Sequence, residues 1–256
     1  DRLPIQIKPY NGQGIHKEGY PIDGNFNTEE IEWTVIINTT RDTLVDAVVT
    51  DNMPEGLILL LGSIVIKEVE VDLQGNVIAE KGIASNYTDA STEEKLTLEL
   101  GDTNEAYQLT FRTKMKETEK DKEGTTLYRN TAFLNSEGLG EKQSSASVSV
   151  KRPESLTKNA SNYDQTDRSV AWTVNANFTE KQLSAGDAIT DEFTFTVGAE
   201  EISDVFEVIE IEIDQVDRFG ADGNVEATSD ATHLFDILIT GQKVTYTLKE
   251  DSSKAF

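Results

Sequence analysis

Three side chains in the first half of the chain, Lys17, Asp51 and Asn130, have the types needed for a covalent cross-link that requires no cofactor. An isopeptide bond within one chain needs a lysine amine, an asparagine carboxamide and a carboxyl group held together away from water. Burial in an apolar core disfavours charge, which lowers the pKa of a lysine and raises the pKa of an aspartate. A neutral amine can then attack the carboxamide while a protonated carboxyl polarises its carbonyl, and ammonia leaves. The second half holds a matching Lys158 and Asp191.

A Lys, Asp or Asn taken singly is usually a surface or turn residue in a β protein. Here, however, the lysine–aspartate pair occurs twice at nearly the same separation, around a shared motif that reads EWTVIIN with Trp33 and AWTVNAN with Trp172. Asn38 and Asn177 follow the two tryptophans at the same distance, and DAVVTDNM later matches DAITDEF. The repeat favours a common role for the two pairs. It also predicts that both tryptophans are core residues, since each lies in an alternating run.

The elements that position these residues are predicted to be β-strands. Apolar and polar residues alternate in many short segments rich in Val, Ile, Thr and aromatic residues, and turn sequences such as DGN separate them. No long amphipathic helix is found. The pattern is typical of a β-sandwich. The clearest predicted strands are Ile31–Asn38, Ser63–Val71, Lys95–Leu100, Tyr107–Lys114 and Ser145–Lys151.

The repeat divides the chain into two predicted modules, residues 1–152 and 153–256, with a short junction at Pro153. A chain of 256 residues is long enough for two such domains. The first module has strands for a complete sandwich, whereas the second is expected to lack its C-terminal strands. Because the sequence begins with Asp1 and not with Met, we expect it to be part of a longer mature chain.

The amino-acid composition argues against several classes of function. A net charge of −24 argues against nucleic-acid binding, because phosphate contacts need clustered Lys and Arg. The chain has no Cys and only two His, so no thiolate zinc site and no Cys nucleophile is available. No metal, cofactor or conventional enzymatic activity is expected, and no apolar run is long enough for membrane insertion. An acidic β protein of this kind suits an extracellular setting.

Several of these motifs resemble a known family. Lys17 before EWTVIIN, the VTDNMPEG segment with Asp51 and the YRNTA segment with Asn130 are similar to the collagen-binding adhesin modules of Gram-positive cell-wall proteins. The resemblance covers nearly the whole chain as two tandem modules. Its motifs are more specific for the fold and the cross-link than for the ligand.

The resemblance implies tandem immunoglobulin-like β-sandwiches of the collagen-adhesin type. It also implies that Lys17 and Asn130 form an isopeptide bond with Asp51 as its catalyst. Lys158 and Asp191 would be the matching residues of the second module. No asparagine partner for Lys158 is expected within the sequence, so we predict that this module does not close its own bond.

Two functions fit these features. The first is a cell-surface adhesin segment that binds host extracellular matrix, with collagen as the implied ligand. The second is a structural stalk whose repeats project another binding head from the cell wall. Both place the protein outside the cell, anchored to the wall in its full-length form, and we expect a monomer. Neither is an enzyme beyond the autocatalytic formation of its own cross-link.

Overall fold

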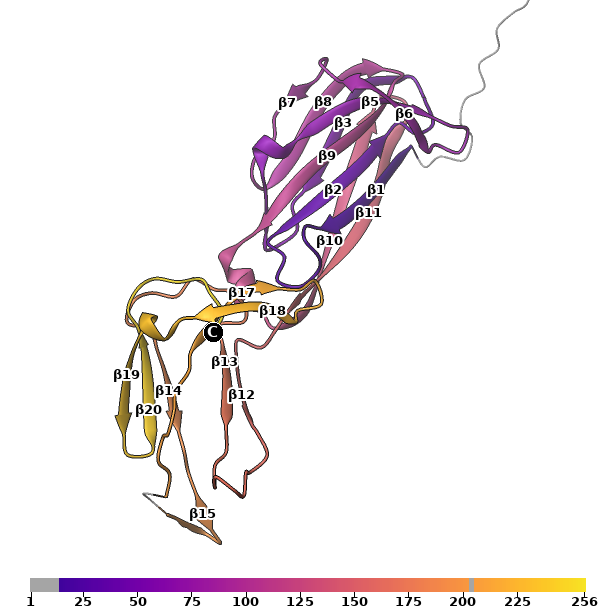
Figure 1. Ribbon diagram of the computed structural model, residues 1–256. Helices are drawn as coiled ribbons and strands as arrows, with labels where there is room; N and C mark the ends of the chain where they lie inside the picture. Colours follow the sequence, from indigo (N-terminus) through magenta and orange to yellow (C-terminus); the bar gives the residue numbers. More distant parts are fainter. Residues whose placement is uncertain (1–13, 203–204) are drawn as a thin grey trace, which may run out of the picture. The chain divides into compact units, whose positions relative to one another are not determined.

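A computed structural model describes residues 14–202 and 205–256 and contains strands, turns and three short 3-10 helices in that part of the chain (Figure 1). The chain forms two compact units. Unit 1 comprises the chain up to Glu119 together with Thr125–Lys151, and unit 2 comprises Lys120–Gly124 together with Arg152–Phe256. The predicted all-β fold class is confirmed. Among the described residues, no helix is long and apolar enough to cross a membrane.

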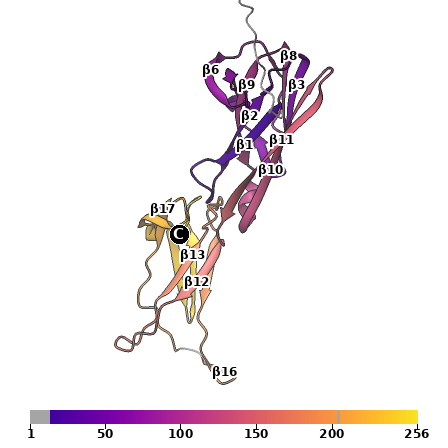
Figure 2. The same ribbon diagram turned by 90° about the vertical axis from the view of Figure 1, so that its right-hand side faces the viewer.

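Unit 1 is a sandwich of two antiparallel sheets, which can be followed in Figures 1 and 2. In the first sheet the order is β1-β2-β9-β5-β6, with β4 also paired to β9. Its strands are β1 (Ile15–Pro21), β2 (Glu30–Ile37), β4 (Leu57–Leu59), β5 (Val65–Val71), β6 (Val77–Ile83) and β9 (Ala106–Met115).

The second sheet of unit 1 has the order β11-β10-β3-β8-β7. Its strands are β3 (Leu44–Asn52), β7 (Thr88–Asp89), β8 (Lys95–Thr103), β10 (Gly124–Ser136) and β11 (Gly140–Arg152). Two 3-10 helices, η1 (Leu61–Ser63) and η2 (Glu117–Asp121), lie in the connections. The first and the second-last strands of the unit therefore belong to opposite sheets.

The core of unit 1 follows from the alternation in its strands. Along β2, every second side chain from Ile31 to Ile37 is buried, because successive side chains of a strand point to opposite faces. Trp33 is the largest of these, and its indole N–H donates to Thr113 Oγ1 at 3.0 Å, which satisfies the buried donor. The prediction that Trp33 is a core residue is confirmed.

Unit 2 consists of smaller sheets. β12 pairs with β13, β14 pairs with β20 and then β19, β15 pairs with β16, and β17 pairs with β18 (Figures 1 and 2). The strands are β12 (Leu156–Ala160), β13 (Trp172–Ala176), β14 (Ala188–Glu192), β15 (Thr196–Val197), β16 (Glu200–Glu201), β17 (Asp214–Phe219), β18 (Val225–Asp230), β19 (Phe235–Thr240) and β20 (Lys243–Leu248). The 3-10 helix η3 (Thr232–Leu234) precedes β19.

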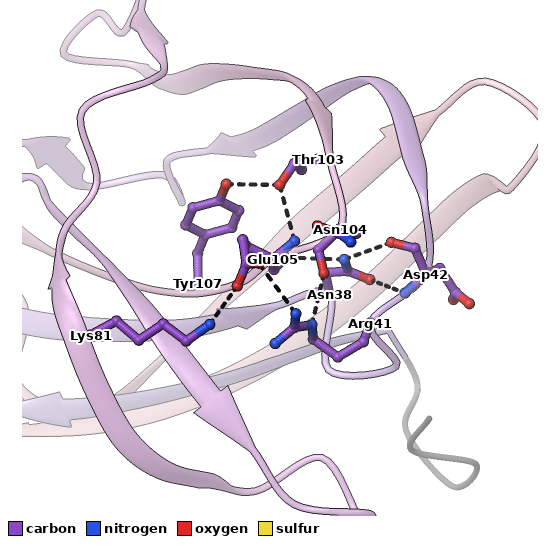
Figure 3. Close-up of polar contacts among 8 residues, drawn as sticks. All are labelled: Asn38, Arg41, Asp42, Lys81, Thr103, Asn104, Glu105 and Tyr107. Atoms are coloured by element: carbon purple, nitrogen blue, oxygen red, sulfur yellow. Dashed lines mark hydrogen bonds and ion pairs between the residues drawn. The ribbon is translucent and has the colours of Figure 1, made fainter. Parts of the chain in front are cut away.

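The two units share one polar turn motif. In unit 1, Asn38 has a left-handed φ of 57°, and its amide group donates to the carbonyl oxygens of Asp42 at 2.9 Å and Glu105 at 3.0 Å. The Asp42 N–H donates back to Asn38 Oδ1. Figure 3 shows this motif beside the Glu105 carboxylate, which pairs with Arg41 and Lys81. The turn after β2 is thus fixed by side-chain hydrogen bonds.

Asn177 makes the same contacts in unit 2. Its φ is 54°, its amide donates to the carbonyl oxygens of Lys181 and Lys254, and the Lys181 N–H donates to its Oδ1. The equal spacing between each tryptophan and the following asparagine, seen in the sequence, therefore reflects the same turn motif in both units. It relies on the tolerance of Asn for the left-handed region.

Trp172 differs from its counterpart. It is 45% exposed, whereas Trp33 is fully buried. The prediction that Trp172 is a core residue is therefore wrong. The physical reason is the strand arrangement. β2 is paired along its length with both β1 and β9, whereas β13 is paired with β12 and, in the described part of unit 2, bonds to Phe256 only through Ala176 at its end.

Candidate functional site

The candidate site of unit 1 lies between its two sheets. Lys17 comes from β1 in the first sheet, and Asp51 from β3 and Asn130 from β10 in the second. Lys17 Nζ contacts Asp51 Oδ2, and both side chains are 0% exposed. The structure thus brings together the lysine and the aspartate that the sequence predicted to meet, within the core.

Strand alternation explains these positions. In β1, Ile15 and Lys17 point inward while His16 and Glu18 are exposed, so the lysine takes a position where an apolar residue would be usual. In the second sheet, Asp51 lies opposite Ala132 of β10. Asn130 is two residues from Ala132 on the same face of that strand and is 1% exposed. It is therefore a diagonal neighbour of Asp51.

Two aromatic rings enclose the lysine amine. Lys17 Nζ lies 4.9 Å from the ring centroid of Trp33 and 4.9 Å from that of Phe111 on β9. Phe111 was not identified from the sequence, although the alternation of YQLTFRTK places it on the buried face. Phe111 is identified as part of the site by its cross-strand pairing with Trp33, which is known only from the structure.

Burial dominates the electrostatics of this pair. It lowers the pKa of Lys17, although the neighbouring Asp51 carboxylate opposes the shift. It also raises the pKa of Asp51 to about 6, against the opposing effects of Lys17 and Asn130. Both shifts favour the neutral forms, because charge is poorly solvated in an apolar interior. A single proton transfer within the contact converts the ion pair into a neutral amine and a neutral acid.

Asn130 and Asp51 retain unused hydrogen-bonding capacity. Neither amide atom of Asn130 has a hydrogen-bond partner among the described protein groups, and neither does Asp51 Oδ1. Buried polar atoms in a folded protein are rarely left unpaired, since each costs about 1 to 3 kcal/mol. A carboxamide beside a lysine–aspartate pair is therefore poorly explained as a purely structural feature.

Unit 2 repeats half of this arrangement. Lys158 Nζ contacts Asp191 Oδ1, and it lies 4.4 Å from the Trp172 ring and 4.5 Å from the Phe193 ring. The pair is less enclosed than in unit 1, with side-chain exposures of 31% for the lysine and 8% for the aspartate. No equivalent of Asn130 adjoins it, because in the described chain β14 pairs with β20 alone.

A groove of about 430 Å³ marks the outer face of the first sheet in unit 1. His16, Thr34 and Gln108, from β1, β2 and β9, line it on one side, and Gln74 and Asn76 come from the turn between β5 and β6. The groove has both polar and apolar lining residues and lies on the opposite side of the sheet from the buried lysine. Sequence reasoning did not find it, since it depends on the order of strands in the sheet.

Residues 12–145 match the family model described as the collagen binding domain. The chain belongs to this collagen-binding domain family. The family resemblance seen in the sequence motifs is therefore confirmed for residues 12–145. No curated protein matches the sequence.

Several solved structures are similar to this collagen-binding family member. The collagen-binding subdomain of the Enterococcus faecalis surface protein ACE is 12% identical over 53% of this chain and 97% of its own, with a TM-score of 0.39. The collagen-binding domain of a Staphylococcus aureus adhesin is 12% identical over 54% of this chain and 97% of its own, at 0.37. BcpA, the major pilin subunit of Bacillus cereus, is 15% identical over 90% of this chain and 65% of its own, at 0.37.

Proposed function

We propose that this chain is a matrix-binding segment of a wall-anchored surface adhesin, with collagen as ligand and unit 1 closed by a Lys17–Asn130 isopeptide bond. The observation that carries the cross-link is the fully buried lysine–aspartate contact next to an asparagine without hydrogen bonds. Family membership supports the ligand.

The reaction balances within the site. Lys17, neutral after proton transfer to Asp51, attacks Cγ of Asn130 through Nζ, while the protonated Asp51 polarises the carboxamide carbonyl. The new bond joins Nζ to Cγ, and the bond from Cγ to Nδ2 breaks. Asp51 relays the amine proton to the departing nitrogen, which leaves as ammonia. No oxidant, metal or cofactor takes part, and the enzyme-like step happens once per molecule.

The proposed bond would join strands from opposite sheets. β1 opens unit 1 and β10 is its second-last strand, so a pulling force along the chain would act on a covalent tie. A disulfide closing a loop of similar length stabilises by about 4 to 5 kcal/mol in the chain-entropy model, and we expect a comparable effect here. With no Cys in the chain, this bond would serve the role that disulfides have in other secreted β proteins.

The groove on the first sheet is the surface that we assign to the ligand. Collagen is a rigid rod of extended chains whose backbone is solvated, so a surface rich in hydrogen-bonding side chains suits it. Thr34 and Gln108 lie partly exposed in the groove and supply such groups. The opposite face of this sheet packs in the core of unit 1.

The ligand assignment is tested with immobilised triple-helical collagen and the whole chain. Gln108→Arg places a long side chain in the groove and is expected to weaken binding at least about tenfold, equivalent to 1.4 kcal/mol. The matched control is Gln143→Arg, an exposed glutamine on β11 of the other sheet, which should leave binding unchanged. Equal effects of the two variants would contradict the groove assignment. No saturable binding by the unmodified chain would instead favour the stalk function.

A further inference from the structure

The groove of unit 1 is formed between segments that are far apart in the sequence. One side is the outer face of β1, β2 and β9. The other side is the turn between β5 and β6, where Gln74, Gly75 and Asn76 line the groove. Because β9 separates β5 from β2 in the sheet, this turn extends past the end of β9 to reach the residues that follow β2. The sheet alone would therefore provide an open face and not a groove.

The pairing of β5 with β6 explains how the turn reaches this place. The register of the pair shifts twice close to the turn, between Glu68 and Val69 and between Glu70 and Val71. Irregularities of this kind bend a pair of strands and increase its twist. β6 is the edge of its sheet and pairs with β5 alone in the described part of unit 1, so no further strand keeps the hairpin in the plane of the sheet.

The turn itself is fixed by its own hydrogen bonds. Asp72 Oδ1 accepts from the backbone N–H groups of Gln74 and Asn76, both at 2.9 Å, and Asp72 Oδ2 accepts from Asn76 Nδ2 at 3.0 Å. Backbone hydrogen bonds also join Asp72 to Gly75 and to Asn76. Among the described residues, the hydrogen bonds of residues 72–76 all close within the turn. We therefore expect the turn to move as one body.

Packing against Thr39 holds the turn in place. Gly75 has a left-handed φ of 87°, and a Cβ atom added there would lie 3.0 Å from Thr39 Cβ. This separation is well below the about 3.5 to 4.0 Å of an ordinary contact between carbon atoms. Thr39 is buried, and its N–H donates to the carbonyl oxygen of Gly14 at 3.2 Å, so it has little room to retreat. Only a residue without a side chain allows this approach.

We propose that Gly75 is a positioning residue of the ligand groove, because its contact with Thr39 holds the β5–β6 turn at the distance from the sheet at which the groove binds collagen. This proposal rests on the ligand assignment made above. Gly75 offers no side chain to the ligand and acts through the place that it gives to Gln74 and Asn76. A side chain at position 75 would push the turn outward and widen the groove. The residues on the sheet side would stay where they are.

The test measures binding of the whole chain to immobilised triple-helical collagen. We expect Gly75→Ala to weaken binding at least about tenfold, because the ligand must then order a displaced wall of the groove. The matched control is Gly138→Ala in the turn between β10 and β11. Its φ of 79° is similar, but a Cβ atom there meets nothing within 4 Å, so the backbone strain is the same without the push. Equal losses of binding in the two variants would overturn the proposal.

A reversible cross-link provides a rescue of the displaced turn. The chain has no Cys, so a double variant with Thr39→Cys and Gly75→Cys contains a single possible disulfide. The Cβ separation of 3.0 Å is slightly below the about 3.5 to 4.5 Å found in disulfides, so a small outward shift permits the bond. We expect the reduced form to bind as weakly as Gly75→Ala. The oxidised form should regain the affinity of the Thr39→Cys single variant.

Two results with the double variant would contradict the proposal. If the oxidised form binds no better than the reduced form, the place of the turn does not set the affinity. If the oxidised form binds more weakly, the turn has to open for the ligand and does not serve as a fixed wall.

The variant Gln108→Arg separates this proposal from the ligand assignment on which it rests. If Gln108→Arg weakens binding and Gly75→Ala does not, the role of Gly75 is wrong and the groove assignment stands. If neither variant weakens binding, the groove assignment is wrong and this proposal is wrong with it.

Discussion

Units 1 and 2 hold the same lysine–aspartate contact in different surroundings. In unit 1 both side chains are fully buried, and Trp33 and Phe111 cover the amine. In unit 2 the lysine is 31% exposed, and its covering ring, Trp172, is itself open to solvent. The ion pair alone does not distinguish the two sites. The difference comes from the strands on either side of it.

This comparison separates the assembly of the reactive pair from its activation. The β1–β2 and β12–β13 hairpins place their lysines in the same register, so local sequence is sufficient to place each lysine, while each aspartate comes from a strand of another sheet. Activation needs desolvation, which raises the pKa of Asp51 to about 6 and lowers that of Lys17. The flanking strands of unit 1 supply that desolvation together with the asparagine.

The largest difference between the units should follow from removal of the bond. We expect Asn130→Ala to lower the free energy of unfolding of unit 1 by about 4 to 5 kcal/mol, because a closed loop becomes open. Lys158→Ala should change unit 2 by less than about 1 kcal/mol, since a partly exposed ion pair contributes little. Each unit has one tryptophan, so urea unfolding followed by fluorescence in a Trp172→Phe background reports on unit 1 alone. A loss below about 1 kcal/mol for Asn130→Ala would contradict the account.

The two tryptophans provide the next comparison. Trp33→Ala removes a fully buried side chain, and we expect a loss of about 3 to 5 kcal/mol in unit 1. Trp172→Ala should cost less than about 1 kcal/mol in unit 2, because the ring is already 45% exposed. Thermal and urea unfolding monitored by circular dichroism measures both. Similar losses in the two units would mean that Trp172 is buried in solution and that the contrast between the units is wrong.

The free energy of unfolding of the bond-free Asn130→Ala variant should depend on pH because of Asp51. The folded-state pKa of Asp51 is raised from 3.8 to about 6, so the folded protein holds this proton more tightly than the unfolded chain. The resulting stabilisation is present below pH 4 and is lost as the pH rises through about 6, a change of about 3 kcal/mol. Urea unfolding at several pH values measures it, and Asn130→Ala with Asp51→Asn is the control. If the difference between the two variants does not change over this range, or changes with the opposite sign, the pKa of Asp51 is not raised.

Substitution of Asn38 and Asn177 should have equal effects in the two units. Asn38→Ala and Asn177→Ala each leave two backbone carbonyls without their donor, at a cost of about 1 to 3 kcal/mol. Glycine at either position keeps the left-handed φ, so Asn38→Gly and Asn177→Gly isolate the loss of the hydrogen bonds. Unfolding of each unit measures the four variants. A large effect in unit 1 alone would show that this turn depends on the flanking strands.

Much of the fold and part of the site could be predicted from the sequence. Period-two alternation identified the strands, and the repeat linked Lys17 to Asp51 and Lys158 to Asp191, because both signals lie in local sequence. The role of Asn130 as the bonded partner stays a prediction. The role of Phe111 and the groove beside Gln108 could not be predicted, since they depend on which strands become neighbours. The exposure of Trp172 was missed for the same reason.

The central claim is that unit 1 closes a Lys17–Asn130 bond while unit 2 of the same chain does not close one. The intact mass of the purified chain tests this most directly. The account predicts a mass below that calculated from the sequence by one ammonia, about 17 Da, and the full calculated mass for Asn130→Ala. An unmodified chain at its calculated mass, or the same deficit in Asn130→Ala, would contradict the account. A deficit of two ammonias would show that unit 2 also closes a bond.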